Sequence, residues 1–171
     1  MVLYTRYWWC LPITRAKENK LASYDPLRLA QQLNGHGLSM ADIATGVAIV
    51  MAESSFQTDA LGGPNDNNTW DRGLWQLNSA YHDEAIAYDP VLATQRAVEV
   101  KGDGDWTPWS AYTNGAWRAH RKLGWMTVRA MVLREKLDEA NRTENELLGH
   151  IDQLEEIIDE AMAVLSTAVS D

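Results

Sequence analysis

One apolar stretch, from Ala44 to Ala52, constrains this chain more than any other part of it. Ser39 and Asp42 form an N-cap and a capping-box acid, so the sequence predicts a helix from Met40 to about Glu53. This helix is apolar on nearly every face, which is typical of a helix buried in a core. Glu53 would then lie at the mouth of the core, where desolvation raises the pKa of a carboxyl. A raised pKa suits a general acid that works near neutral pH.

A polar loop follows this helix. Taken alone, a glutamate in a last helical turn is usually solvated, so the catalytic interpretation of Glu53 depends on what comes next. Residues 57 to 72 are rich in turn formers, with Leu61 to Thr69 almost entirely Gly, Pro, Asn and Asp. A loop of this length in a compact domain usually lines a substrate cleft. Gly73 to Asn78 alternates enough to predict a short extended piece.

Helix signals also flank this region. Asp25-Pro26 and Asp89-Pro90 each place an N-cap before a proline, and they predict helices that end near Gly35 or Gly37 and at Lys101. After the aromatic segment from Trp106 to Trp117, we expect a helix to about Leu123 and a break at Gly124. The sequence therefore predicts a mainly α domain over residues 21–128 with a small extended or β element at the cleft.

Length and composition limit what else the chain can contain. Its 171 residues allow one domain of ordinary size plus an appendage. Cys10 is the only cysteine, which excludes an intrachain disulfide and a cysteine metal cluster, and we expect no metal and no cofactor. There is no apolar run long enough to span a bilayer, and residues 1–20, an aromatic and basic leader, do not resemble a secretory signal. This leader can pack on the domain or dock on a partner.

The last part of the chain has a different character. Apolar residues recur in steps of four and three from residue 133 to residue 168, and Glu144 alone breaks the series. This seven-residue repeat predicts that residues 129–171 form a coiled-coil helix, continuous from Ala130 to Ala168, that joins parallel copies as a dimer or a trimer. The alternative is a helix that lies on its own domain. These residues hold 4 basic and 11 acidic side chains, so a nucleic-acid partner is excluded.

Three short motifs carry the functional signal: Glu53-Ser54, Gly73-Leu74-Trp75-Gln76 and Ala111-Tyr112-Thr113-Asn114. In this order they resemble the Glu-Ser, Gly-Leu-Met-Gln and Ala-Tyr-Asn motifs of lytic transglycosylases and goose-type lysozymes. The chain looks most like the small lysozyme-like domains of actinobacterial phage tail and lysis proteins, which often read Asp-Arg-Gly-Leu-Trp-Gln-Ile-Asn. The resemblance covers about Leu21 to Trp125 and implies a lysozyme-like α fold.

The resemblance also implies roles for individual residues. Glu53 is expected to protonate the glycosidic oxygen, Ser54 to position the site and Gln76 to line the cleft, while Tyr112 would hydrogen-bond the Glu53 carboxyl. The residues expected to bind substrate are Ser54, Trp75, Gln76, Asn78, Trp109, Tyr112 and Asn114. Gln76 and Asn114 have an alternative role as turn stabilisers.

The reaction depends on a second carboxylate. Ordinary glycosidases need a pair of carboxylates. Lytic transglycosylases, by resemblance, need only one, because the muramoyl 6-hydroxyl attacks internally and leaves a 1,6-anhydro end. Asn78 stands where goose-type lysozymes carry an Asp, which favours the transglycosylase, although Asp66 and Asp71 remain as candidate water-positioning carboxylates.

The sequence therefore predicts a peptidoglycan-degrading glycosidase that cleaves the MurNAc-GlcNAc β-1,4 bond. By resemblance it belongs to a phage virion tail, where other tail proteins are partners and the bacterial wall is opened during infection. Two alternatives remain open: a structural tail protein that binds wall glycan with little or no turnover, and a lysozyme-type hydrolase acting as an endolysin.

Overall fold

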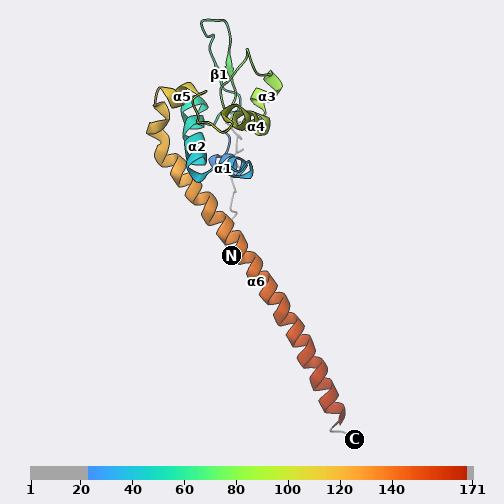
Figure 1. Cartoon of the computed structure of the whole chain (residues 1–171). Helices are drawn as coiled ribbons and strands as arrows, with labels where there is room; N and C mark the ends of the chain where they lie inside the picture. Colours follow the sequence, from blue (N-terminus) through green and yellow to red (C-terminus); the bar gives the residue numbers. More distant parts are fainter. Residues whose placement is uncertain (1–22, 169–171) are drawn as a thin grey trace, which may run out of the picture.

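The computed structural model describes residues 23–168, with side chains described through residue 163. The leader over residues 1–20, with Cys10, lies outside the described residues, so the expectations for it stay predictions. The described part is mainly helical with one small sheet and a long C-terminal helix (Figure 1), which confirms the fold class predicted from the sequence.

Helix α2 (Met40–Ser54) lies at the centre of the core. The Ser39 hydroxyl accepts a hydrogen bond from the Asp42 amide at 3.1 Å, so the helix begins where the capping signal predicts. Its buried residues face every direction: Ile43, Ala44, Gly46, Val47, Ala48, Ile49, Val50 and Ser54. Helix α1 (Pro26–Gly35), capped by Asp25 as predicted, and the first turns of α6 (Arg121–Ala168) pack against it. The all-round burial of α2 fixes the position of Glu53 at its last turn.

A small antiparallel sheet follows α2 in the order β1 (Leu61–Gly62), β2 (Asp71–Arg72) and β3 (Leu77–Asn78). The predicted extended piece is therefore strand only at its last two residues, and residues 73–76 form a turn instead. Gly73 begins this turn with a φ of +70°, and a Cβ at this position would overlap the carbonyl oxygen of Ala87. Only glycine meets both requirements.

Four short elements complete the domain. Helix α4 (Pro90–Lys101) begins at the predicted Asp89 cap, whose carboxylate accepts hydrogen bonds from the amides of Val91 and Leu92. Helix α3 (Glu84–Tyr88) was not predicted. The segment after α4 forms α5 (Ser110–Thr113) and a 3₁₀ helix, η1 (Ala116–His120).

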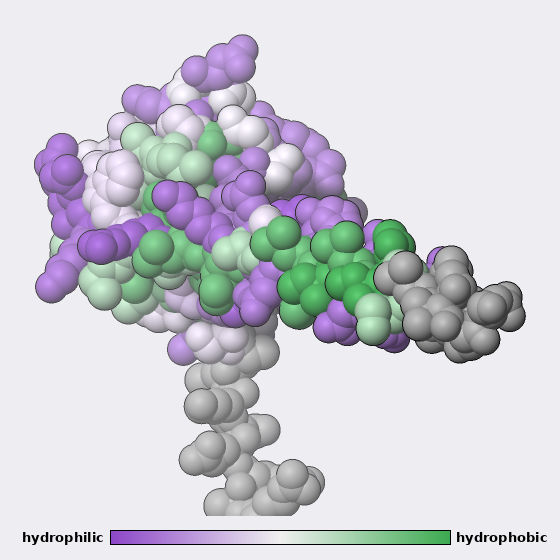
Figure 2. Space-filling model, turned by 90° about the horizontal axis from the view of Figure 1, so that it is seen from below, coloured by the Kyte–Doolittle hydropathy of each residue, from purple (hydrophilic) through white to green (hydrophobic). Residues whose placement is uncertain are grey.

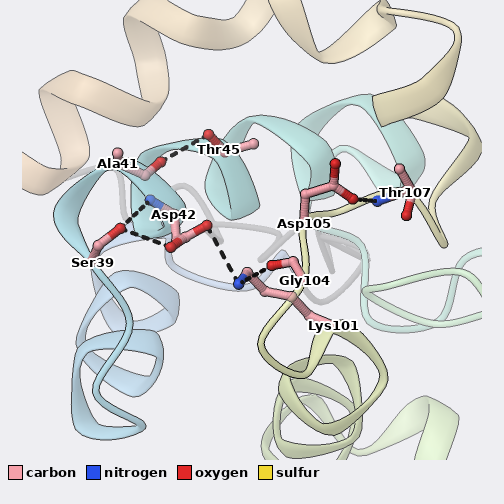
Figure 3. Close-up of polar contacts among 8 residues, drawn as sticks. All are labelled: Ser39, Ala41, Asp42, Thr45, Lys101, Gly104, Asp105 and Thr107. Atoms are coloured by element: carbon pink, nitrogen blue, oxygen red, sulfur yellow. Dashed lines mark hydrogen bonds and ion pairs between the residues drawn. The ribbon is translucent and has the colours of Figure 1, made fainter.

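Lys101 joins the end of α4 to the start of α2 (Figure 3). Its ammonium donates to the Gly104 carbonyl at 2.8 Å and lies 3.5 Å from a carboxylate oxygen of Asp42. The side chain is only 8% exposed, and its ammonium also lies over the Trp106 ring. Asp42 therefore accepts a hydrogen bond from the Ser39 hydroxyl and pairs with Lys101, which ties the two helices together.

Helix α6 corrects the predicted break at Gly124. The helix runs through Gly124 without interruption, and this glycine is buried against α2, where a Cβ would overlap the carbonyl oxygen of Ala44. The glycine thus allows two helices to approach closely rather than ending one of them. Val128 and Met131 also lie in the core.

Beyond Val132, every described side chain of α6 is exposed. We call residues 133–168 the stalk and residues 23–132 the head. The predicted continuous helix from Ala130 to Ala168 is confirmed, whereas its pairing with other copies and the domain boundary at residue 128 stay predictions. None of the described helices is both long enough and apolar enough to span a membrane.

The contact between Gly124 and Ala44 leads to a stability test on α6. We expect Gly124→Ala to lower the free energy of unfolding by about 1–3 kcal/mol, because the added methyl forces α2 and α6 apart. Gly149→Ala is the matched control, since nothing lies within 4 Å of a Cβ there. This control should gain roughly 0.5–1 kcal/mol from helix propensity. Denaturant unfolding measures both, and equal effects of the two substitutions would contradict the close crossing.

Candidate functional site

A cavity of about 580 Å³ opens beside the last turn of α2. The sheet, α4 and the segment before α5 supply its other walls. The described residues that line it are Glu53, Asp71, Gln76, Leu77, Asn78, Tyr81, His82, Arg96, Val100, Pro108, Trp109 and Ser110. Of the residues singled out from the sequence, the structure thus brings Glu53, Asp71, Gln76, Asn78 and Trp109 together around one space.

The Glu53 carboxyl is half-buried and held from one side. One of its oxygens accepts a hydrogen bond from the Ala111 amide at 3.0 Å and a longer one from the Ser110 hydroxyl at 3.5 Å. Burial raises the pKa of Glu53, and the negative charge of Asp71 raises it further, against the opposing effect of the two hydrogen bonds. The carboxyl is therefore biased toward the protonated form that a general acid needs.

Asp71 has a different environment from that of Glu53. Strands β2 and β3 pair in a register that places Asp71 directly opposite Asn78. The side-chain amides of Asn78 and Asn65 donate to the two oxygens of the Asp71 carboxylate, at 2.8 and 3.1 Å. Both amides also donate to the Thr69 hydroxyl, at 2.9 and 3.1 Å. Hydrogen bonds of this kind fix the orientation of the carboxylate.

Gln76 and Ser54 connect the motifs to one another. The Gln76 amide nitrogen donates to the carbonyls of Gly73 and Ala60, at 2.9 and 3.3 Å, and the residue has a φ of +49°, which is uncommon for a residue with a side chain. The buried Ser54 hydroxyl donates to the Leu74 carbonyl at 2.8 Å. Ser54 therefore ties α2 to the Gly73–Gln76 turn, and Gln76 faces the cavity from that turn.

The predicted hydrogen bond between Tyr112 and Glu53 is wrong. The Tyr112 ring instead stacks on Trp117, with centroids 5.5 Å apart, and Tyr112 does not line the cavity. The contacts to Glu53 come instead from the two residues before Tyr112, through the Ala111 amide and the Ser110 hydroxyl.

Asn114, Trp75 and Asp66 also lie outside the set that lines the cavity. The side-chain oxygen of Asn114 accepts a hydrogen bond from the Ala116 amide at 2.8 Å. This is the turn-stabilising role that the sequence left open. Trp75 is fully buried and donates to the Thr94 hydroxyl at 3.0 Å, so it belongs to the core and does not reach substrate. Asp66 is exposed on the loop, which leaves Asp71 as the second carboxylate in the cavity.

Several lining residues were not predicted as site residues. Arg96 and Val100 lie one turn apart on α4 and face the cavity, so their spacing is a signal that can be read once α4 is known to form a wall. His82 and Ser110 fit no sequence pattern. The Ala111 contribution is a backbone amide, which a search for reactive side chains does not detect.

Part of the chain is similar in sequence to known lysozymes. Residues 30–111 match the sequence model of a family described as lysozyme-like domain. Lysozyme X of Drosophila melanogaster is 27% identical over 105 residues, which cover 52% of this chain and 74% of that protein. A lysozyme of Galleria mellonella is 40% identical over 53 residues, covering 31% of this chain and 44% of its own length.

One solved structure illustrates the likeness in fold. The crystal structure of a lysozyme from Litopenaeus vannamei has 25% identity and a TM-score of 0.45, and the match covers 53% of this chain and 85% of that one. The sequence matches support a lysozyme-like domain with lysozyme homologues, and the family match spans Glu53 and Asp71.

The raised pKa of Glu53 predicts a pH-dependent gain in stability for Glu53→Gln. A carboxyl whose pKa is higher in the folded state destabilises the fold above that pKa and ceases to do so below its unfolded value, about 4.3. The glutamine should therefore raise the melting temperature most at neutral pH, and the gain should vanish as the pH falls toward 4. Thermal unfolding across this range measures the effect.

The control for this experiment is Glu139→Gln, which removes an exposed carboxyl on the stalk. A gain for Glu53→Gln that is independent of pH, or equal to that of the control, would contradict the assigned environment of Glu53.

Proposed function

We propose that this chain cleaves the β-1,4 bond between MurNAc and GlcNAc in peptidoglycan, with Glu53 as the general acid. The observation that carries the proposal is a pair of carboxyl groups that face one cavity. Burial raises the pKa of the Glu53 carboxyl, whereas two side-chain amides hold the Asp71 carboxylate in a fixed orientation. Two carboxyl groups in one cavity are the arrangement that glycoside cleavage ordinarily uses. The likeness to lysozymes supports the substrate class.

In this proposal Glu53 gives its proton to the glycosidic oxygen as the bond from that oxygen to the sugar carbon breaks. Positive charge develops on the sugar ring, and the Asp71 carboxylate stabilises it across the cavity. Water then adds to the sugar carbon, and Glu53 takes a proton back. The products are a free reducing end and a free hydroxyl on the neighbouring sugar.

This route is hydrolysis, and it differs from the transglycosylase that the sequence favoured. That preference depended on Asn78, which stands where an acid was expected. The hydrogen bond from Asn78 to Asp71 supports another role for it, since an amide that orients a carboxylate assists a two-carboxylate reaction. A single-acid transglycosylase remains the second candidate, because Glu53 alone suffices for it.

Two isosteric substitutions separate these reactions. We expect Glu53→Gln to lower the rate of peptidoglycan cleavage by a factor of about 10² or more, because it removes the transferable proton. Asp71→Asn should also lower the rate strongly, and wild-type digests should contain reducing ends. Mass analysis of the product ends gives the outcome. Anhydro ends, with the activity of Asp71→Asn near wild type, would establish the transglycosylase instead, and unchanged activity in Glu53→Gln would overturn both.

We also propose that the stalk joins several copies of this chain. Large apolar side chains follow one face of the stalk and are each at least 50% exposed: Leu133, Leu137, Leu147, Ile151, Leu154 and Ile158. Figure 2 shows such residues gathered along the projecting helix. A seven-residue repeat on one helix fits the same repeat on a second copy, which favours self-association over an unrelated partner.

The width of this face favours more than two copies. Leu148, Ile157 and Met162 flank the repeat and are also exposed, so around Ile151 the apolar surface covers about half of the helix at 3.6 residues per turn. A two-stranded coil buries only a narrow stripe. Acidic residues on the other half remain in solvent in such an assembly. We therefore favour a parallel trimer, the larger of the two assemblies expected from the sequence.

Placing Asp at both Ile151 and Ile158 tests this association. Unpaired charges in a buried seam are costly, so the assembly should dissociate while the head stays folded. The matched control places Asp at Asn145 and Gln153, which lie outside the apolar face and add the same charge. Sedimentation or light scattering at micromolar concentration gives the mass, and a monomeric unmutated chain would contradict the proposal.

The phage setting is part of the same proposal. Its support is the resemblance of residues 71–78, which read Asp-Arg-Gly-Leu-Trp-Gln-Leu-Asn, to the Asp-Arg-Gly-Leu-Trp-Gln-Ile-Asn motif of phage tail and lysis proteins. In this setting the stalk attaches the head to tail proteins, and cleavage opens the host wall during infection. Mass spectrometry of purified virions decides the question: peptides of this chain in virions indicate a tail component, and their presence in lysates alone indicates an endolysin.

A further inference from the structure

A cation and a neutral imidazole share one wall of the cavity. Arg96 of α4 and His82 of the segment after β3 both line it, and the Arg96 Nε donates to the His82 Nδ1 at 3.3 Å. A guanidinium only donates, so the Nδ1 that it meets is the acceptor nitrogen of the ring. The ring proton then lies on Nε2. Burial and the charge of Arg96 lower the pKa of His82, which keeps the ring neutral.

This arrangement leaves hydrogen-bond donors free. Arg96 uses Nη1 for Glu99, at 2.9 Å, and Nε for His82, while its Nη2 makes no hydrogen bond to any described residue. The same holds for the His82 Nε2 within the described part of the chain. The pair with Glu99 is exposed and lies along one helix, and such pairs contribute little to stability. Stabilisation of α4 therefore does not account for an arginine in the cavity wall.

The charges of the residues that line the cavity indicate which ligand group these free donors would bind. Among the described residues that line it, Arg96 carries the only positive charge, and Glu53 and Asp71 are the carboxyl groups. A neutral polysaccharide has no group that needs a cation. A carboxylate does, and a guanidinium with an adjacent N–H presents the planar set of donors that carboxylates bind best. The ring of Tyr81, 6.5 Å from that of His82, packs edge-on beside the imidazole.

We infer that Arg96 and His82 form a subsite for a carboxylate carried by the glycan, which makes the enzyme selective for acidic glycan over neutral glycan. This inference rests on the proposed function, because it concerns the same cavity. Peptidoglycan offers two sources of the carboxylate: the lactyl group of muramic acid when it carries no peptide, and the peptide stem when it does.

Binding measurements in the full-length Glu53→Gln chain test the subsite without turnover. Four glycans of equal length serve as ligands: neutral N-acetylglucosamine oligomers, glycan with free lactyl carboxylates, glycan with peptide stems, and the last with its carboxylates converted to amides. We expect at least one carboxylate-bearing glycan to bind roughly tenfold or more tightly than its neutral counterpart. The preferred ligand identifies the source of the carboxylate.

Arg96→Gln, added to this background, should reduce the ratio of the affinities for charged and neutral glycan to near one. It should change the affinity for neutral oligomers less than twofold. Arg96→Lys should keep part of the preference, because it keeps the charge and loses the planar fork. Arg129→Gln, an exposed arginine on α6, is the matched control for net charge and should change nothing. Equal loss for charged and neutral ligands, or a preference that survives Arg96→Gln, would overturn the inference.

The two proposals can fail separately. If the wild-type chain cleaves no peptidoglycan and the preference still depends on Arg96, the proposed function fails and the subsite stands. If cleavage occurs and no carboxylate preference is found, the subsite fails and the proposed function stands.

Discussion

Three mutually packed indoles support one wall of the cavity that holds Glu53. Trp75 and Trp106 stack with centroids 5.4 Å apart, and Trp109 meets both edge-on at 5.5 and 5.3 Å. The Trp109 indole donates to the Trp75 carbonyl at 3.0 Å, which joins the Gly73–Gln76 turn to the segment before α5. Buried aromatic groups of this size contribute more than their area because their geometry is specific. This cluster therefore sets the distance between the turn with Gln76 and the Ala111 amide that contacts Glu53.

The helix starts could be predicted from sequence because they depend on neighbouring residues. The caps at Asp25, Ser39 and Asp89 begin helices where expected, since a cap acts over three or four residues. The apolar helix before Glu53 was readable for a similar reason. The close packing of α6 against α2 could not be predicted from local sequence. Gly124 resembles a helix end, and only its contact with Ala44 shows why a side chain is excluded there.

The site shows the same division. Glu53 could be singled out from sequence because it ends an apolar helix, Gln76 because it matches a family motif, and Asp71 because it is a carboxylate in the cleft loop. The role of Asn78 depends on strand register, which places it opposite Asp71 and makes it an orienting donor. Trp75 was expected to bind substrate from the family resemblance, whereas the structure buries it in the core. His82 and Arg96 meet across 14 positions of sequence, and no periodic pattern connects them.

The continuity of α6 links the cavity mechanically to the stalk. Gly124, Val128 and Met131 pack into the head, and the same helix continues into solvent without a loop (Figure 1). The stalk is roughly 54 Å long at 1.5 Å per residue. Because no described linker interrupts the helix, a head cannot turn freely about its stalk, and its cavity keeps one orientation relative to the stalk axis. In an assembly of parallel stalks, every cavity would then keep the same fixed orientation relative to its own stalk. Such an arrangement presents several sites to a polymeric substrate together, and binding by one head raises the local concentration of glycan at the others.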